Sequence, residues 1–388
     1  MNPKSIINLF SILVLLFSFS FVFPIVISIV FDDGALPIFL KTLISISLLG
    51  LAGLFLTRNI KNDLSQKDGF VIIVMFWIVL SLTGSVPFYL SGMSLIDSVF
   101  ESMSGITTTG ATVISSLDGL PESILFYRQL LQWMGGMGLI VLAIAVMPLL
   151  GIGGGQIYKT EVPGAMGEQR LTPRIKETAQ ALWLIYFGLT AICGILYYLN
   201  GMTAFDAISH AMSTVAIGGF STHDESIGFF NSISIELICI CFMLLSAFSF
   251  ALHYFAIYKR KPLKYAFDPE FRFFISFLFI TFFIAVLIGL FVESGKSPSI
   301  REIIFHTVSM VTTTGFSISD SSDWPFSMSF LLLIGAFVGA CSGSVGGGVK
   351  SWRIMIMLNH AYKNIMKIIH PNSVISLKIG TKSVGDDV

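Results

Sequence analysis

The chain has 388 residues, of which 54% are hydrophobic and 12% are charged, and its mean hydropathy is +0.83. Soluble domains carry about a quarter of their residues as charged groups, so this composition argues against a soluble globule and excludes a disordered chain and a coiled coil. The 23 Lys and Arg residues balance 23 Asp and Glu residues, which excludes the basic excess of a nucleic-acid-binding protein.

Eight apolar runs are long enough to cross a bilayer, which takes about 20 apolar residues in a helix. They span roughly residues 6–30, 36–56, 69–90, 124–150, 179–199, 233–258, 271–292 and 327–358. The first run is too long for the core of a signal peptide, and the last is unusually long and interrupted by glycines. The sequence therefore predicts an all-α polytopic membrane protein.

Basic residues predict the orientation, because Lys and Arg in short loops stay on the cytoplasmic side. All but four of the 23 Lys and Arg residues fall in one set of loops. The exceptions are Lys41, Arg128, Lys296 and Arg301. Both termini are therefore expected to be cytoplasmic.

Acidic residues gather in the loops that this orientation places outside. They are Asp32, Asp33, Asp97, Glu101, Asp118, Glu122, Asp206, Asp224, Glu225, Glu236, Glu293, Glu302, Asp320 and Asp323. Asp and Glu contribute little to topology, so membrane insertion alone does not explain this excess. A negative mouth that concentrates cations would explain it; a solvated acidic surface is the alternative.

Three outer segments share one template, in which an acidic residue lies 13 positions before a glycine and a serine lies six positions before it. The acid, serine and glycine are Asp97, Ser104 and Gly110, then Asp206, Ser213 and Gly219, then Glu302, Ser309 and Gly315. About ten residues of helix rise roughly 15 Å, half of a hydrocarbon core of about 30 Å. We therefore expect three half-helices that enter from outside, stop near mid-membrane and return through an extended stretch.

The tips of these segments have the composition of a cation path. Non-helical backbone at this depth is tolerated where it is buried in protein or lines a water-filled path. Glycine lets carbonyl groups turn toward an axis, and rings of carbonyl oxygens can replace the hydration shell of a monovalent cation. The middle tip lacks the threonines of the other two, so backbone carbonyls must carry the common role. One such motif is usually an ordinary loop, but three copies in register favour a filter.

The last apolar run contains a glycine-rich segment, residues 339–350, at what should be mid-membrane depth. Glycine costs about 1 kcal/mol per residue in a helix, so this segment should open into a loop. Close helix packing through small residues is the alternative. Lys350 is either a cation below the filter or a side chain that reaches the cytoplasmic interface.

With its spanning helix, half-helix, glycine tip and second spanning helix, the repeat resembles the Trk/Ktr superfamily of potassium transporters, most closely the TrkH type. The matching motifs are TTTGAT at 107–112, QWMGGMG at 132–138, AIGGFST at 216–222, TTTGF at 312–316 and GSVGGGVK at 343–350. The likeness covers the whole chain. It implies repeated units of membrane helix, pore half-helix, filter loop and membrane helix around a central pore.

The resemblance also implies a function and its residues. The function is K⁺ uptake across the bacterial inner membrane, by symport or in a channel-like mode, without an organic cofactor. The filter is expected to comprise Thr108, Thr109, Gly110, Ile217, Gly218, Gly219, Thr313, Thr314 and Gly315. The backbone carbonyls expected to hold K⁺ are those of Thr108, Thr109, Ile217, Gly218, Thr313 and Thr314. The expected gate is an intramembrane loop formed by Gly343, Ser344, Gly346, Gly347, Gly348 and Lys350.

By the same resemblance, the expected partners are membrane lipid, a second copy of the chain and a TrkA-like cytoplasmic nucleotide-binding regulatory subunit. The domains are expected to be an accessory helix pair at 1–66, pore repeats at 67–158, 159–266 and 267–365, and a cytoplasmic tail at 366–388. The family has four repeats. The spacing of the glycines would put a fourth near residues 411–424, beyond Val388. We interpret this as a truncated form of a four-repeat transporter; a partner chain that supplies the fourth repeat and a non-conducting remnant are alternatives.

Other functions fit the sequence less well. A secondary transporter of another small solute would be built from inverted repeats, whereas all three half-helices are expected to enter from one side. A serine hydrolase frame around Ser342 fails, because position 340 is alanine. His210 and His306 take the place of Glu101 in their repeats, and we interpret them as polar packing. The glycines between Trp133 and Gly138 are interpreted as packing that positions the filter.

Overall fold

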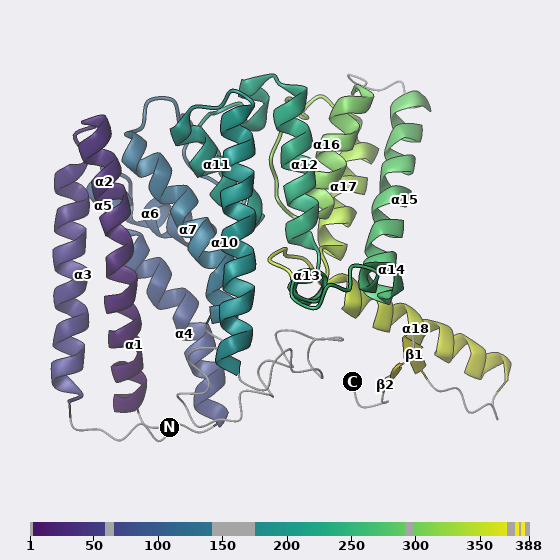
Figure 1. Cartoon of the computed structure of the whole chain (residues 1–388), viewed down its shortest axis with the longest axis horizontal. Coiled ribbons are helices and arrows are strands. Elements are labelled where there is room, and N and C mark those ends of the chain that lie inside the picture. The colour runs from purple at the N-terminus through teal and green to yellow at the C-terminus, as the bar shows by residue number, and fades with distance from the viewer. Residues whose placement is uncertain are drawn as a thin grey trace.

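The computed structural model describes residues 3–58, 66–141, 175–291, 298–370, 377–379 and 382–384. The regular secondary structure of this part of the chain is helical apart from one antiparallel hairpin, β1 (Leu377–Ile379) and β2 (Lys382–Val384), in which Lys378 pairs with Ser383. The predicted all-α membrane architecture is confirmed. In Figure 1 the start of α1 and the whole of α18 lie at the same end of the bundle.

Four helical stretches in the described residues are long and apolar enough to cross a membrane. They are Lys4–Phe31, Leu36–Leu56, Gln180–Leu199 and Pro269–Phe291, close to four of the predicted runs. The first stretch consists of α1 (Pro3–Ser18), a short 3-10 turn η1 (Phe19–Phe21) and α2 (Val22–Phe31), and the others lie in α3 (Leu36–Leu56), α10 (Ile175–Leu199) and α15 (Pro269–Phe291). Their exposed faces carry large apolar side chains, such as Phe279 and Phe283 of α15.

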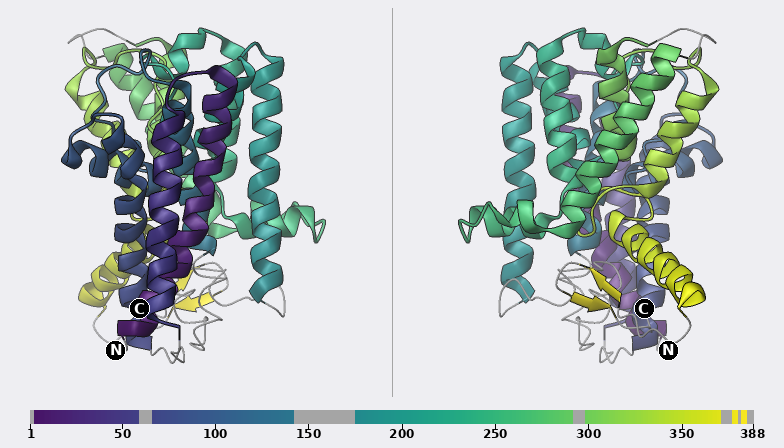
Figure 2. Two further views of the ribbon diagram at one scale, coloured as in Figure 1. Left: turned by 90° about the vertical axis from the view of Figure 1, so that its left-hand side faces the viewer. Right: turned by 90° about the vertical axis from the view of Figure 1, so that its right-hand side faces the viewer.

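Two predicted spans are not straight helices, and for the first of them the expectation of one continuous spanning helix was wrong. The run 233–258 forms α12 (Ile233–Ala247) and α13 (Phe250–Ile257), which meet at an angle of 97°. Phe248 is extended at the bend, and the backbone N–H of Phe250 donates to the carbonyl oxygen of Gly343 instead of continuing the helix. Figure 2 shows α13 and α14 (Lys264–Phe267) projecting sideways from the bundle.

The second broken span is the last apolar run. It divides into α17 (Phe326–Val338) and α18 (Ser351–Ile369), with the glycine-rich segment as an irregular loop between them. The predicted opening of the helix by glycine is therefore confirmed, although α18 leaves the bundle at a slant (Figure 1). We call residues 339–350 the glycine loop.

The three half-helices are α6 (Leu95–Ile106), α11 (Ala204–Ala216) and α16 (Ile300–Val311), with 12, 13 and 12 residues. At 1.5 Å per residue each is about 18–20 Å long, close to the predicted half-membrane length. They all start at the end of the bundle opposite to the start of α1 (Figure 1). We call this the outer end and the opposite one the inner end.

Each half-helix starts with the same N-terminal cap, which the sequence analysis overlooked. The side chains of Ser94, Thr203 and Ser299 accept hydrogen bonds from the backbone N–H groups of Asp97, Asp206 and Glu302. A serine or threonine three residues before an acid is a recognised helix-start pattern. The acid of the repeat template therefore belongs to the cap, where it also faces the positive end of the helix dipole.

Longer helices flank each half-helix. The first lies between α4 (Gln66–Gly84) with α5 (Val86–Leu90) and α7 (Glu122–Val141), the second between α10 and α12, and the third between α15 and α17. Two main apolar cores result. Tyr127 of α7 joins the N-terminal core, where it packs against Phe21, Phe39 and Phe88, and Trp133 of the same helix packs against the other core. Helix α7 therefore connects the two halves of the bundle. Predicted positions 142–174 lie outside the described residues.

Candidate ion filter and gate

The three half-helices end in the same backbone turn at their tips. Thr108, Ile217 and Thr313 all have left-handed backbone angles, with φ of 55°, 53° and 67°. The N–H of the next residue then reaches back to a serine carbonyl oxygen. These bonds join Thr109 to Ser104, Gly218 to Ser213 and Thr314 to Ser309, at 2.9, 2.9 and 2.7 Å. This is the Schellman arrangement, and it explains the serine of the repeat template by its carbonyl group.

The tip glycines bring neighbouring repeats into contact. Gly110 and Gly219 have φ of 77° and 80°, angles that side-chained residues adopt at a cost. A methyl group on Gly110 would overlap the carbonyl oxygen of Gly218, and one on Gly219 would overlap that of Thr314. Both positions therefore require glycine, because a side chain would strain the backbone and collide with the neighbouring repeat. Gly315 is exposed, and among the described residues nothing lies within 4 Å of a methyl group placed on it.

Threonine hydroxyls brace the first and third tips. The hydroxyls of Thr107 and Thr109 lie 2.8 Å apart, as do those of Thr312 and Thr314. Thr107 and Thr312 also reach carbonyl oxygens one helical turn back, at 2.7 and 2.8 Å. The hydroxyls thus hold the turns.

The middle tip is held by Gln132, which the sequence analysis did not single out as a functional residue. This side chain is fully buried on α7. Its Nε2 donates to the carbonyl oxygen of Gly218 at 2.6 Å, and its Oε1 accepts from the Ser213 hydroxyl at 2.7 Å and the Phe220 N–H at 3.1 Å.

A buried ion pair supports the segments that return from the first two tips. The Nε of Arg128 lies 2.7 Å from the Glu101 carboxylate, and both side chains are almost wholly shielded. Thr112 donates to Glu101 at 3.0 Å, while Arg128 donates to the carbonyl oxygen of Ser221 at 3.1 Å and lies 4.2 Å over the Phe220 ring. The sequence counted Glu101 and Arg128 in outer charged layers, but they neutralise each other inside the protein.

The histidines at the positions equivalent to Glu101 have similar places. His210 contacts the carbonyl oxygen of Asp206 and the hydroxyl of Ser221, both at 2.9 Å. His306 contacts the carbonyl oxygen of Glu302 at 3.0 Å and packs against Trp324 with ring centres 4.7 Å apart. These contacts support the interpretation of both as polar packing.

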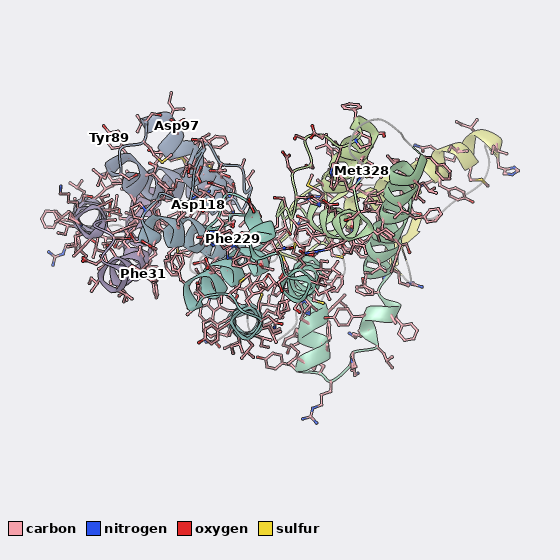
Figure 3. All side chains as sticks on the ribbon, turned by 90° about the horizontal axis from the view of Figure 1, so that it is seen from above. Phe31, Tyr89, Asp97, Asp118, Phe229 and Met328 are labelled. Carbon is pink, nitrogen blue, oxygen red and sulfur yellow. The ribbon has the colours of Figure 1, made fainter. Side chains whose placement is uncertain are left out.

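An acidic hollow lies at the outer end, next to the return segments of the second and third repeats. It has a volume of about 610 Å³ and its acidic lining consists of Asp224, Glu225 and Asp320. Viewed from this end, Asp118 and Phe229 lie close to each other (Figure 3). His223 stacks on Phe229 with ring centres 3.6 Å apart and lies 3.4 Å from Asp118 and 3.3 Å from Asp206.

The pKa of His223 is raised above its ordinary value. Burial alone would lower this pKa, but hydrogen bonds and charge from Asp206 and Asp118 outweigh burial. His223 lies in a loop outside the spanning helices, and its side chain is 19% exposed, so it can exchange protons with solvent.

The glycine loop touches all three repeats directly below the tips. Methyl groups placed on two glycines show how close the approach is: one on Gly136 of α7 would lie 2.8 Å from Val345, and one on Gly346 would lie 3.1 Å from the Thr312 carbonyl oxygen and 3.6 Å from the Ile217 side chain. The N–H of Gly347 donates to the Thr313 hydroxyl at 2.7 Å. The structure thus brings the predicted loop and the predicted tips together.

Glu270 at the start of α15 ties down both ends of this loop. Its Oε1 accepts from the N–H groups of Ser342, at 2.5 Å, and Trp352, at 3.1 Å. The N–H of Cys341 also donates to the Ala247 carbonyl oxygen at 3.1 Å, where α12 ends. Lys350 is half-buried and donates to the Gly346 carbonyl oxygen, so it closes the loop on itself.

Half-helices that meet tip to tip between spanning helices, with an irregular loop against the inner side of the tips, define a polytopic membrane protein with half-membrane segments. Comparison with known protein families shows which kind of membrane protein this is. The sequence model of the TrkH family, described as a cation transport protein, matches residues 35–388, and the chain belongs to this family.

Proteins of known function and structure are similar over the whole chain. The Trk system potassium uptake protein TrkH of Halomonas elongata is 48% identical over 392 residues, which span 100% of this chain and 81% of that protein. The protein of the same name in Escherichia coli K12 is 42% identical over 393 residues, with the same coverage. The crystal structure of the potassium transporter TrkH from Vibrio parahaemolyticus superposes with a TM-score of 0.88 at 43% identity, and covers 99% of this chain and 80% of that one.

Removal of the cation from the buried pair is expected to destabilise the fold. Arg128→Met leaves Glu101 buried without its partner, which costs about 3–5 kcal/mol. Glu101→Gln in the same chain should recover part of this loss, because the remaining side chain is then neutral. Unfolding of the purified protein in detergent measures both. If the double variant loses as much stability as Arg128→Met and Glu101→Gln lose separately, added together, the pairing is contradicted.

His223→Gln is expected to destabilise the protein in a pH-dependent manner. A raised folded-state pKa means that protonated His223 stabilises the fold. This contribution is complete below the ordinary value of 6.5 and is lost as the pH rises through the raised pKa. The difference in melting temperature between the protein and this variant should therefore be larger at about pH 5.5 than at about pH 8.5. A melting-temperature difference that grows with pH would refute the raised pKa of His223.

Proposed function

We propose that the chain takes up K⁺ across the membrane, with the three tips as its selectivity filter and the glycine loop as its gate. The observation that carries this proposal is the mutual contact of the tips, where carbonyl oxygens of Gly218 and Thr314 meet the glycines of the preceding repeats. K⁺ is the bound and transported ion, and the chain is a transporter, not an enzyme. It needs no organic cofactor.

Selectivity in this proposal comes from backbone oxygens at fixed positions. Carbonyls of Thr108, Thr109, Ile217, Gly218, Thr313 and Thr314 would replace the water around K⁺. The half-helices point the partial negative charge of their C-terminal ends at the same region. The acidic hollow at the outer end would raise the local cation concentration before entry.

The glycine loop is suited to closing this path. It lies against the inner side of the tips, and Gly343, Ser344, Gly346, Gly347, Gly348 and Lys350 form its body. Its ends are held by hydrogen bonds to Glu270 and Ala247, and its centre is held by bonds to Phe250 and Thr313. A displacement that breaks these few bonds would open the path without unfolding a helix.

The remaining proposals concern the membrane location, the orientation, the partners and the domain limits of the chain. We propose an inner-membrane location with both termini cytoplasmic, a homodimer, and a TrkA-like regulatory subunit at the basic inner end. Basic side chains at that end, among them Lys259, Arg260 and Lys261 after α13, support both the orientation and the docking. The domain limits remain as proposed from the sequence: 1–66, 67–158, 159–266, 267–365 and 366–388.

Transport is tested in bacterial cells that lack their own K⁺ uptake systems. The chain should restore growth at low K⁺ and take up K⁺ in preference to Na⁺. Gly219→Ser should lower the K⁺/Na⁺ uptake ratio about tenfold, which corresponds to about 1.4 kcal/mol, because its side chain displaces the Thr314 carbonyl. Gly201→Ser is the matched control, since Gly201 also has a positive φ but has nothing within 4 Å. Membrane insertion without any K⁺ uptake would overturn the proposed function.

The gate is tested separately through Glu270. Glu270→Ala removes the acceptor of two N–H groups, and each buried donor left without a partner costs about 1–3 kcal/mol, so K⁺ flux should rise several-fold at an unchanged K⁺/Na⁺ ratio. Glu270→Gln keeps an oxygen acceptor and should stay close to the parent protein. Asp268→Asn, two residues away, controls for a change at the start of α15. A fall in the K⁺/Na⁺ ratio would place Glu270 with the filter instead of the gate.

A further inference from the structure

We propose that Gln132 positions the middle tip of the filter and so determines its ion selectivity, replacing the threonine pair that braces the other two tips. This inference rests on the proposed function, because selectivity is assigned to the tips. It adds a residue from a different repeat, 86 positions before the carbonyl that it holds.

The first observation is a difference among the three tips. Thr107 with Thr109, and Thr312 with Thr314, form hydroxyl pairs across the turn. Ala216 and Gly218 occupy the equivalent positions of the middle tip. They carry no hydroxyl, yet Ile217 between them has the same left-handed angle as its counterparts. The middle turn therefore needs another source of stabilisation.

The second observation is that Gln132 supplies contacts on all sides of this turn. Its carboxamide bonds to Ser213 in the half-helix, Gly218 in the turn and Phe220 in the return segment. One side chain thus fixes the relative positions of the three parts of the middle tip.

The third observation is a matched fit between Gln132 and Gly218. A methyl group on Gly218 would overlap the carboxamide carbon and oxygen of Gln132 and would lie 2.8 Å from its nitrogen. Gln132 in this position therefore requires glycine at 218. The absence of threonine at 218 is a consequence of this arrangement: a threonine there has no space while Gln132 is present.

Hydrogen-bond chemistry connects this contact to ion selectivity. A carbonyl oxygen has two lone pairs, so the Gly218 oxygen can accept from Gln132 and still face an ion. The N–H donor of Gln132 fixes the direction of this carbonyl group. Without it, the carbonyl could rotate, and the number and spacing of oxygens around the ion would no longer favour one cation.

Helix α7 has further contacts on the same face. Residues 132, 135 and 136 are spaced by three and four positions, so they lie on one side of the helix. A methyl group on Gly135 would overlap the Ile106 carbonyl oxygen of the first tip, and one on Gly136 would lie 3.3 Å from Ala216. Gln132 is therefore held on a helix that is packed against two tips, which makes it a rigid support.

A matched pair of variants tests the role of Gln132. Gln132→Met keeps the volume of the side chain and removes its three hydrogen bonds, so the K⁺/Na⁺ uptake ratio should fall about tenfold. Gln129→Met makes the same change one turn earlier on α7, at a fully buried amide that has no hydrogen-bond partner within the described part of the chain. Its ratio should stay at the parent value. Equal ratios for the two variants in a conducting protein would overturn the inference and leave the proposed function intact.

Amide hydrogen exchange gives a readout that does not depend on transport. The Phe220 N–H donates to Gln132, so its exchange in the purified protein should become at least several-fold faster in Gln132→Met than in Gln129→Met. Gln132→Glu provides a second variant: once ionised at high pH, it keeps the acceptor for Phe220 but has no donor for Gly218, so exchange should stay slow, relative to Gln132→Met at the same pH, while selectivity falls. Unchanged Phe220 exchange in Gln132→Met would refute the positioning role even if the chain carried no ion.

A rescue experiment tests the replacement of one brace by the other. Ala216→Thr with Gly218→Thr installs the threonine pair, and should abolish selective uptake because the new side chain at position 218 collides with Gln132. Addition of Gln132→Ala makes space for the pair, and this triple variant should have a higher K⁺/Na⁺ ratio than Gln132→Ala alone. A triple variant no better than Gln132→Ala would show that the two braces are not equivalent.

Discussion

Backbone groups that stop in the middle of a membrane have no water to bind, so each half-helix must satisfy its last carbonyl groups within the protein. In all three repeats a Schellman turn does this with a residue in the left-handed conformation. That turn reverses the chain, and in the first two repeats it brings the tip glycine against a carbonyl oxygen of the next repeat. The geometry of the proposed filter therefore follows from the way in which the half-helices end.

Holding a residue such as Ile217 in this conformation costs about 1–2 kcal/mol, so the turns need support from their surroundings. The support is polar, and its chemistry differs from repeat to repeat. Threonine pairs hold the first and third tips, while an amide holds the second. The ion pair of Glu101 with Arg128 fixes the return segments of the first two repeats relative to each other. Unpaired, these groups would be costly in an apolar interior, which is why each has its partner within reach.

The parts of the fold that the sequence predicts well depend on local patterns. Apolar length identified spans such as 36–56, the spacing from Asp97 to Gly110 predicted a half-helix, and glycine content predicted the loop after Val338. The caps at Ser94, Thr203 and Ser299 were also readable, since a serine or threonine three residues before an acid is a local pattern. The residues that support the site could not be predicted from such local patterns. Gln132 meets Gly218 across 86 positions, and Glu270 meets Ser342 across 72, and nothing in the sequence near either residue indicates its partner. The bend at Phe248 has the same origin, because the partner of Phe250 is Gly343, far along the chain.

Two residues of the proposed filter contact the proposed gate directly, so a movement of the gate would act on the filter. Thr313 supplies the left-handed residue of the third tip, and its hydroxyl accepts the hydrogen bond from Gly347 of the glycine loop. Ile217, at the same position of the second tip, packs against the loop through its side chain. A loop that moves away therefore removes a contact from two of the turns that orient the carbonyl groups. Because those turns carry backbone strain, the loss of such a contact makes the left-handed conformation of Ile217 or Thr313 less stable. The helix α7 packs against both the tips and Val345, and so limits how far the tips can follow the loop. In the proposed mechanism, opening of the path and coordination of the ion would therefore be linked through two residues, Ile217 and Thr313.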